Sequence, residues 1–211
     1  WWWWPLALLA GAAMINFFNF IDGSNGMAAI QAIVAGVLLG LASSSMPMQA
    51  LALALAVACL AFLPFNFPRA RAFMGDVGSG ALGYWCALLA FAGGMPDWER
   101  IGAVMVILSA VWADAGFTLL WRFSRGPKGR WYTAHREHLY QWLVRSGHSH
   151  AVVAGWYAAW TLGPAAVCLW WAHQHPWSYW ILIPLLYALA ASIWIHIRRR
   201  LYRLALAGRH A

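Results

Sequence analysis

Long apolar stretches alternate with short polar segments along the whole chain. A helix needs about 20 residues to cross a bilayer, and several stretches are near the lower limit of this length. Because lipid offers the backbone no hydrogen-bond partner, we predict that each stretch is a helix. The predicted fold is one all-α integral membrane domain, residues 1–211, with about seven transmembrane helices. The stretches are residues 3–21, 27–42, 50–65, 79–94, 101–121, 151–171 and 177–197.

The composition also indicates that the surrounding solvent is lipid. Hydrophobic residues make up 63% of the chain and charged residues 9%, whereas a soluble domain carries about a quarter charged residues. The formal net charge of +8 does not indicate a nucleic-acid partner, because the basic residues lie in short loops between apolar stretches. Cys59, Cys86 and Cys168 lie inside apolar stretches, and we interpret them as buried thiols.

The basic residues predict the orientation of these helices. If the stretches cross the membrane in alternation, all of the 14 Lys and Arg residues except Arg100 fall on one side. Loops rich in Lys and Arg face the cytoplasm. We therefore expect residues 22–26, 66–78 and 122–150 and the tail from Arg198 to be cytoplasmic. The tail is also expected to contact anionic head groups.

A first polar cluster ends the first apolar stretch. Asn16, Asn19 and Asp22 are three residues apart, so a helix would place them near one another on one face. Such groups need polar partners, which a neighbouring helix could supply. The alternative is a bound phosphate, because Gly23 and Gly26 can end the helix and turn backbone N–H groups toward an anion.

A second polar cluster precedes the fourth apolar stretch. Asp76 is flanked there by Gly75 and Gly78 at a predicted membrane face. Proteins typically hold Mg²⁺ with one or two carboxylates together with substrate phosphates. Asp76 is therefore a candidate magnesium ligand. The alternative is that this segment only caps the following helix.

The loop of residues 122–150 carries a third cluster and is predicted to be cytoplasmic. If its middle is helical, His135 and His138 lie one turn apart, which suits a zinc ion or an anionic phosphate. The adjacent Arg136 favours the phosphate. Asp114 is the first of several polar residues that share one face of the preceding apolar stretch, which ends at this loop. Since all three clusters fall on one side, we predict a cytoplasmic-face active-site cleft for a polyphosphate and a divalent metal.

Three motifs carry a resemblance that covers about residues 14 to 150. They are Asn16-x-x-Asn19-x-x-Asp22-Gly23-x-x-Gly26, Asn66 followed by Phe73-Met74-Gly75-Asp76-x-Gly78-Ser79, and Ala134-His135-Arg136-x-His138-x-Tyr140-Gln141. Together they resemble the polyprenyl-phosphate N-acetylhexosamine-1-phosphate transferases, membrane glycosyltransferase family 4. The third motif is similar to the histidine loop of the bacterial surface-polysaccharide branch.

The resemblance implies transfer of an N-acetylhexosamine-1-phosphate from a UDP-sugar to undecaprenyl phosphate, with release of UMP. The product would initiate O-antigen (lipopolysaccharide) or a related envelope glycan at the bacterial inner membrane, and Mg²⁺ would be the cofactor. No nucleic acid is expected as a partner, and a homodimer is left open. Candidate catalytic residues are Asp22, Asp76, His135 and His138, candidate metal ligands are Asp76 and Asn19, and candidate substrate-binding residues are Asn16, Asn25, Asn66, Arg136 and Asp114.

Two departures from the family pattern limit this interpretation. Asn25 stands where the family usually has an Asp, which puts nucleotide recognition in question. The family's adjacent Asp pair on an earlier loop is absent, and the chain opens with four tryptophans, so we interpret it as the C-terminal part of the family's domain. A non-catalytic family member is the main alternative. A transporter is less favoured, because no internal repeat is visible.

Overall fold

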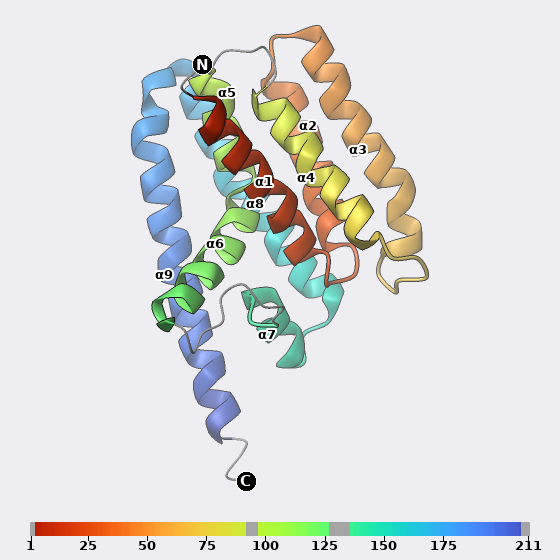
Figure 1. The fold of residues 1–211 in the computed structure, drawn as a ribbon, viewed down its shortest axis with the longest axis vertical. Coiled ribbons are helices and arrows are strands. Elements are labelled where there is room, and N and C mark those ends of the chain that lie inside the picture. Colours follow the sequence, from red (N-terminus) through yellow and green to blue (C-terminus); the bar gives the residue numbers. More distant parts are fainter. Residues whose placement is uncertain (1–2, 92–96, 127–135, 208–211) are drawn as a thin grey trace.

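The apolar stretches form helices that run side by side as a bundle (Figure 1). The structure, a computed structural model, describes residues 3–91, 97–126 and 136–207, and no β-strand occurs among them. The predicted all-α fold is confirmed. The helices are α1 (Trp4–Ile21), α2 (Met27–Ala42), α3 (Met46–Asn66), α4 (Gly75–Phe91), α5 (Trp98–Ile107), α6 (Ser109–Ser124), α7 (Leu139–Arg145), α8 (His150–Gln174) and α9 (Tyr179–Ala207), with a 3₁₀ turn at Pro176–Ser178.

Within the described residues each predicted stretch overlaps a helix, but the helices differ in length. By length and composition, α1, α3, α8 and α9 with its preceding turn can each cross a membrane. The stretch 101–121 is broken at Leu108 into α5 and α6, which are bent by 76° and qualify only as a pair. The described residues thus contain four candidate spans, or five with the bent pair. That α2, with 16 residues, and α4, with 17, also span stays a prediction.

Small residues let neighbouring helices approach closely. A Cβ added at Gly36 of α2 would lie 2.5 Å from the backbone oxygen of Ala52 in α3, and one at Gly83 of α4 equally close to that of Met14 in α1. Helices in lipid associate largely through such packing, because lipid tails are as apolar as the helices themselves. The glycines therefore help to define the α2–α3 and α1–α4 pairs.

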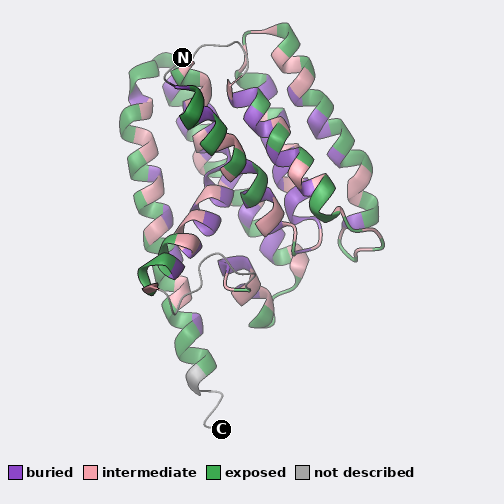
Figure 2. Cartoon of the chain, viewed as in Figure 1, coloured by how far each residue is buried: buried purple, intermediate pink, exposed green. Residues whose placement is uncertain are grey.

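The outer surface of the bundle is apolar. Exposed residues lie along the outer faces of α1, α3 and α9, while buried residues lie between the helices (Figure 2). Large hydrophobic side chains are among the exposed ones, for example Leu8, Val57 and Trp180. An exposed apolar surface of this extent indicates contact with a membrane.

The polar segments gather at one end of the bundle. The loop after α1, the connection from α3 to α4 and the short helix α7 lie at the same end as the last turns of α9, and the start of α1 lies at the other (Figure 1). This arrangement agrees with the alternation predicted from the basic residues. It brings the predicted polar clusters of distant segments close together.

Candidate functional site

The first and second polar clusters are joined by hydrogen bonds. The N–H of Gly26 donates to Oδ1 of Asn66 at 2.7 Å, and Nδ2 of Asn66 donates to the Ala72 carbonyl at 2.8 Å. Nδ2 of Asn25 donates to the Pro68 carbonyl at 3.2 Å. Asn25 and Asn66, two of the predicted substrate-binding residues, thus connect the loop after α1 to the α3–α4 connection. Their roles toward a substrate stay predictions.

The close contact between these loops depends on Gly26. Its φ of 72° lies in the left-handed region, which residues with a side chain rarely adopt. A Cβ at this position would also lie 2.6 Å from a ring carbon of Phe67. Glycine therefore allows the loop after α1 to turn against the α3–α4 connection.

Asp22 and Asp76 form an acidic pair beside this junction. Asp22 is half-buried after α1, and Asp76 is exposed in the first turn of α4, where the helix dipole favours a carboxylate. Burial raises the pKa of Asp22 from 3.8 to about 6; the Gly75 N–H opposes this rise and the charge of Asp76 adds to it. The two carboxylates repel each other, and a divalent cation would relieve that repulsion.

The donors of this acidic pair fit Mg²⁺. Among the described residues, no group of three or more His, Cys, Asp or Glu could hold a metal ion. Mg²⁺ does not require such a group, because one or two carboxylates with substrate phosphates suffice. Asn19, the other predicted ligand, lies one turn before Asp22, whereas Asn16 donates to the Ala12 carbonyl of its own helix at 2.7 Å. The zinc alternative includes His135, which lies outside the described residues, so it stays a prediction.

Asp114 holds α7 in place from inside the bundle. Its buried carboxylate accepts hydrogen bonds from the N–H groups of Leu139 at 2.7 Å and Tyr140 at 3.3 Å. The Tyr157 hydroxyl of α8 donates to it at 2.7 Å. The first N–H groups of a helix have no partner within the helix, so Asp114 satisfies two of them. Its predicted contact with substrate is untested, but its oxygens are engaged internally.

His138 is buried immediately before α7. Its ring lies 5.2 Å from that of Phe20, and its Nδ1 lies 3.9 Å from Oδ1 of Asp114. Burial lowers its pKa below 6.5, as do the charges of Arg122 and Arg198, while Asp114 opposes the shift. These surroundings therefore favour a neutral His138, buried behind the exposed part of the site. Its catalytic role stays a prediction.

The loop after α1 also contacts the third cluster. The Tyr140 hydroxyl donates to the Phe20 carbonyl at 2.8 Å, and Gly23 lies so close to this hydroxyl that a side chain there would collide with it. The Ser24 hydroxyl and His150 Nδ1 form a hydrogen bond of 2.9 Å. The predicted convergence of the three clusters is therefore present, with the loop after α1 between the other two.

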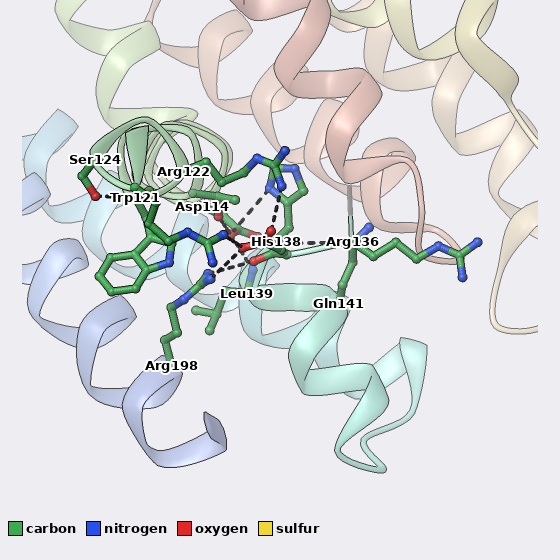
Figure 3. Close-up of polar contacts among 12 residues, drawn as sticks. Asp114, Trp121, Arg122, Ser124, Arg136, His138, Leu139, Gln141 and Arg198 are labelled. Atoms are coloured by element: carbon green, nitrogen blue, oxygen red, sulfur yellow. Dashed lines mark hydrogen bonds and ion pairs between the residues drawn. The ribbon is translucent and has the colours of Figure 1, made fainter. Parts of the chain in front are cut away.

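Glu137 is surrounded by three arginines, of which Figure 3 labels Arg122 and Arg198. Arg122 lies 2.7 Å from its Oε1, and Arg125 and Arg198 lie 2.6 Å and 3.3 Å from its Oε2. Burial alone would raise the pKa of Glu137, but the charges of Arg125, Arg122 and Arg198 outweigh it and hold the pKa below 4.5. This cluster connects α6 and α9 to the segment that leads into α7.

Two predicted residues precede this cluster in the chain. Arg136 is exposed, its side chain extends away from Arg198 (Figure 3), and its carbonyl accepts a hydrogen bond from Arg145 at 2.5 Å. His135 lies outside the described residues. The expected helix through this segment begins only at Leu139, so its pairing with His138 along a helix is not confirmed.

Sequence reasoning missed several residues that assemble the site. Tyr140, Tyr157 and His150 hold the clusters together, yet none was predicted as a site residue. An aromatic residue within an apolar stretch carries no signal that its hydroxyl meets a carboxylate 43 residues away. For Arg198, the position in a basic tail indicated only contact with lipid.

Fold and site together define an all-α integral membrane protein with an acidic pair and a separate arginine cluster at one end of its bundle. The family described as Glycosyl transferase family 4 matches residues 1–94. The phospho-N-acetylmuramoyl-pentapeptide-transferase of Synechococcus sp. (strain JA-2-3B'a(2-13)) is 34% identical over 74% of this chain and 44% of its own length. The decaprenyl-phosphate N-acetylglucosaminephosphotransferase of Mycolicibacterium smegmatis is 30% identical over 69% of this chain and 41% of its own length.

The chain belongs to the polyprenyl-phosphate N-acetylhexosamine-1-phosphate transferase family. The resemblance seen in the motifs is thereby confirmed. The chain spans less than half the length of these two relatives. Neither of their names mentions O-antigen, so the predicted surface-polysaccharide branch gains no support from them.

Proposed function

We propose that the protein transfers an N-acetylhexosamine-1-phosphate from a UDP-sugar to undecaprenyl phosphate and releases UMP. The observation that carries this proposal is the convergence of the acidic pair, the glycine-containing loop and the histidine segment at one end of a membrane bundle. The two relatives support it, because their names describe transfer of a phosphorylated N-acetyl sugar. Initiation of O-antigen or a related envelope glycan is part of the proposal.

In the proposed reaction, an oxygen of the acceptor phosphate attacks the phosphorus that carries the sugar, and the bond from this phosphorus to the UMP oxygen breaks. Asp22, Asp76 and Asn19 would hold Mg²⁺. When bound, Mg²⁺ neutralises charge on the diphosphate and helps to orient the attack. The exposed Arg136 contacts the diphosphate, and the buried His138 helps to position that segment.

The proposed location is the bacterial inner membrane, with the site facing the cytoplasm. The basic segments support this orientation, because the α3–α4 connection, the end of α6 and the end of α9 carry arginines. The opposite end carries Arg100 in the first turns of α5, paired with Asp97 at 3.0 Å. This placement gives the site access to both a cytoplasmic nucleotide sugar and a lipid acceptor.

The proposal is tested with Asp76→Asn in the full-length protein. Membranes that contain this variant are supplied with undecaprenyl phosphate and a radiolabelled UDP-N-acetyl sugar, and lipid-linked sugar is measured. We expect product formation to fall at least about 100-fold, as when an electrostatic group at a reacting centre is removed. Asp97→Asn, at the other end of the bundle, should leave product formation nearly unchanged.

Near-normal turnover by Asp76→Asn would reject the role of Asp76. If the unaltered full-length protein forms no lipid-linked sugar from any UDP-N-acetyl sugar, the proposed activity is wrong. That result would favour the alternative of a non-catalytic family member.

A further inference from the structure

An apolar groove of about 210 Å³ opens where α6, α7, α8 and α9 meet. Aliphatic and aromatic side chains line most of it, including Ala110, Leu139, Trp156, Trp160, Ala190 and Trp194. Asp114 and Tyr157 also reach the lining, but they are hydrogen-bonded to each other. The lining therefore suits an alkyl chain better than a polar ligand.

Arg198 lies at one end of this groove. It follows Ile197, which lines the groove, and its guanidinium carbon lies 4.8 Å from the ring centroid of Trp194, another lining residue. The rings of Trp121 and Trp142 lie 5.4 Å and 5.9 Å from the same carbon. Aromatic faces attract a guanidinium, so these contacts hold a cation where the apolar lining ends.

The surroundings of Arg198 carry an excess of positive charge. Arg122, Arg125 and Arg198 face the carboxylate of Glu137, and Asp114 in the groove lining also acts on Arg198, so these described residues have three positive charges against two negative charges. The Arg125 side chain is 45% exposed and can still reach a ligand. Arginine binds phosphate through paired, charge-assisted hydrogen bonds. The cluster thus complements an anionic phosphate at the end of the groove.

The indole of Trp194 gives an independent indication of a ligand. The residue is 6% exposed, and among the described residues its indole N–H has no hydrogen-bond acceptor. Buried donors rarely remain unpaired in native proteins, because the loss of hydration is not compensated. A phosphate or ester oxygen of a ligand in the groove would supply the missing acceptor.

The groove lies away from the acidic pair. Asp22 follows α1 and Asp76 begins α4, whereas α6, α7, α8 and α9 form the groove, and α9 runs along the edge of the bundle opposite α3 (Figure 1). A phosphate bound at Arg198 is therefore badly placed to react at the acidic pair. This favours a lipid that binds without reacting.

We propose that this groove binds an anionic phospholipid of the surrounding bilayer. One acyl chain occupies the apolar lining, and the phosphate contacts Arg198 and Arg125. The bound lipid bridges α9 to α6 and so supports the Glu137 segment that leads into α7. This proposal does not depend on the transferase activity.

The probe is phosphatidylglycerol, compared with phosphatidylcholine that has the same acyl chains. Native mass spectrometry of the delipidated full-length protein in detergent measures the affinity for each lipid. We expect phosphatidylglycerol to bind more tightly. Arg198→Gln should weaken phosphatidylglycerol about fivefold, the loss that corresponds to one basic residue at a lipid head group. Arg199→Gln, an exposed neighbour outside the groove, should have little effect.

Two further variants test the groove itself. Ala190→Leu fills the lining and should reduce binding of both phospholipids, whereas Ala188→Leu, on the exposed face of α9, should not. Trp194→Phe keeps an aromatic ring under Arg198 but removes the N–H, and it should weaken phosphatidylglycerol without lowering the helix content. Because Trp194→Phe adds no bulk, it tests the site even if Ala190→Leu fails to fold.

Equal affinity for the two phospholipids would overturn the proposal, as would equal binding by the Ala190→Leu and Ala188→Leu variants. Undecaprenyl phosphate is the competing occupant. If Ala190→Leu abolishes its binding and leaves phosphatidylglycerol unaffected, the groove belongs to the acceptor and our assignment is wrong.

Discussion

At the scale of single residues, the surroundings of Asp22 make a testable difference to stability. Burial, together with the charge of Asp76, raises the pKa of Asp22 from 3.8 to about 6. The folded protein therefore favours the protonated acid, and the folded state loses stability as the pH rises through this window. The test is thermal unfolding at a series of pH values without divalent cations. At low pH, Asp22→Asn should unfold at the same temperature as the unaltered protein, and above about pH 6 it should unfold at a higher temperature.

Asp76→Asn provides the matched comparison for this experiment. It removes the charge that helps to raise the pKa of Asp22, so the pH window should move toward lower values. A stability difference between Asp22→Asn and the unaltered protein that is the same at about pH 4 and about pH 7 would contradict the prediction.

Other residues show how a correct choice from sequence can still miss the structural role. Asp114 was selected because polar groups in or beside a membrane are costly, and Asn66 because it belongs to a family motif. In the structure Asn66 connects two loops, and Asp114 accepts from two N–H groups of α7. Each partner lies on a different segment, so the cost of burial was predictable and the identity of the partner was not.

At the scale of elements, α7 depends on its neighbours. It has seven residues, too few for a helix to be stable on its own in water. Asp114 caps it, and Glu137 fixes the preceding segment to Arg122, Arg125 and Arg198. The order of α7 thus comes from contacts with α6 and α9.

Glu137→Gln tests this dependence. The variant removes one negative charge from among three arginines, which then repel one another. Hydrogen–deuterium exchange of the purified protein should become faster in α7, whereas exchange in α2 and α3 should stay unchanged because those helices do not contact the cluster. Unchanged protection of α7 would show that Asp114 alone suffices to hold it.

At the scale of the whole molecule, the orientation in the membrane can be tested with two single cysteines. Arg71 in the α3–α4 connection and Ser44 in the α2–α3 connection are both exposed, and they lie beyond opposite ends of α3. The three native cysteines are buried and should label poorly. In intact cells an impermeant thiol reagent should label Ser44→Cys but should label Arg71→Cys only after permeabilisation. The reverse pattern would overturn the proposed orientation.

The sequence by itself determined where the helices lie along the chain, which connections share one end of the bundle, and where the polar segments are. Hydropathy and the positions of arginines are local properties, and the need to pair every backbone group in lipid turns an apolar stretch into a helix. The motif residues Asp22, Asp76 and His138 were visible for the same reason, since polar groups are conspicuous in an apolar chain.

Only the tertiary structure decided the 76° bend at Leu108, the burial of His138 and the attachment of Glu137 to Arg198. The attachment joins two residues that are 61 positions apart in the sequence. The sequence around a basic residue in a tail is the same whether the side chain contacts a lipid head group or a carboxylate. Its partner is set by how α9 packs beside α6, which no local pattern encodes.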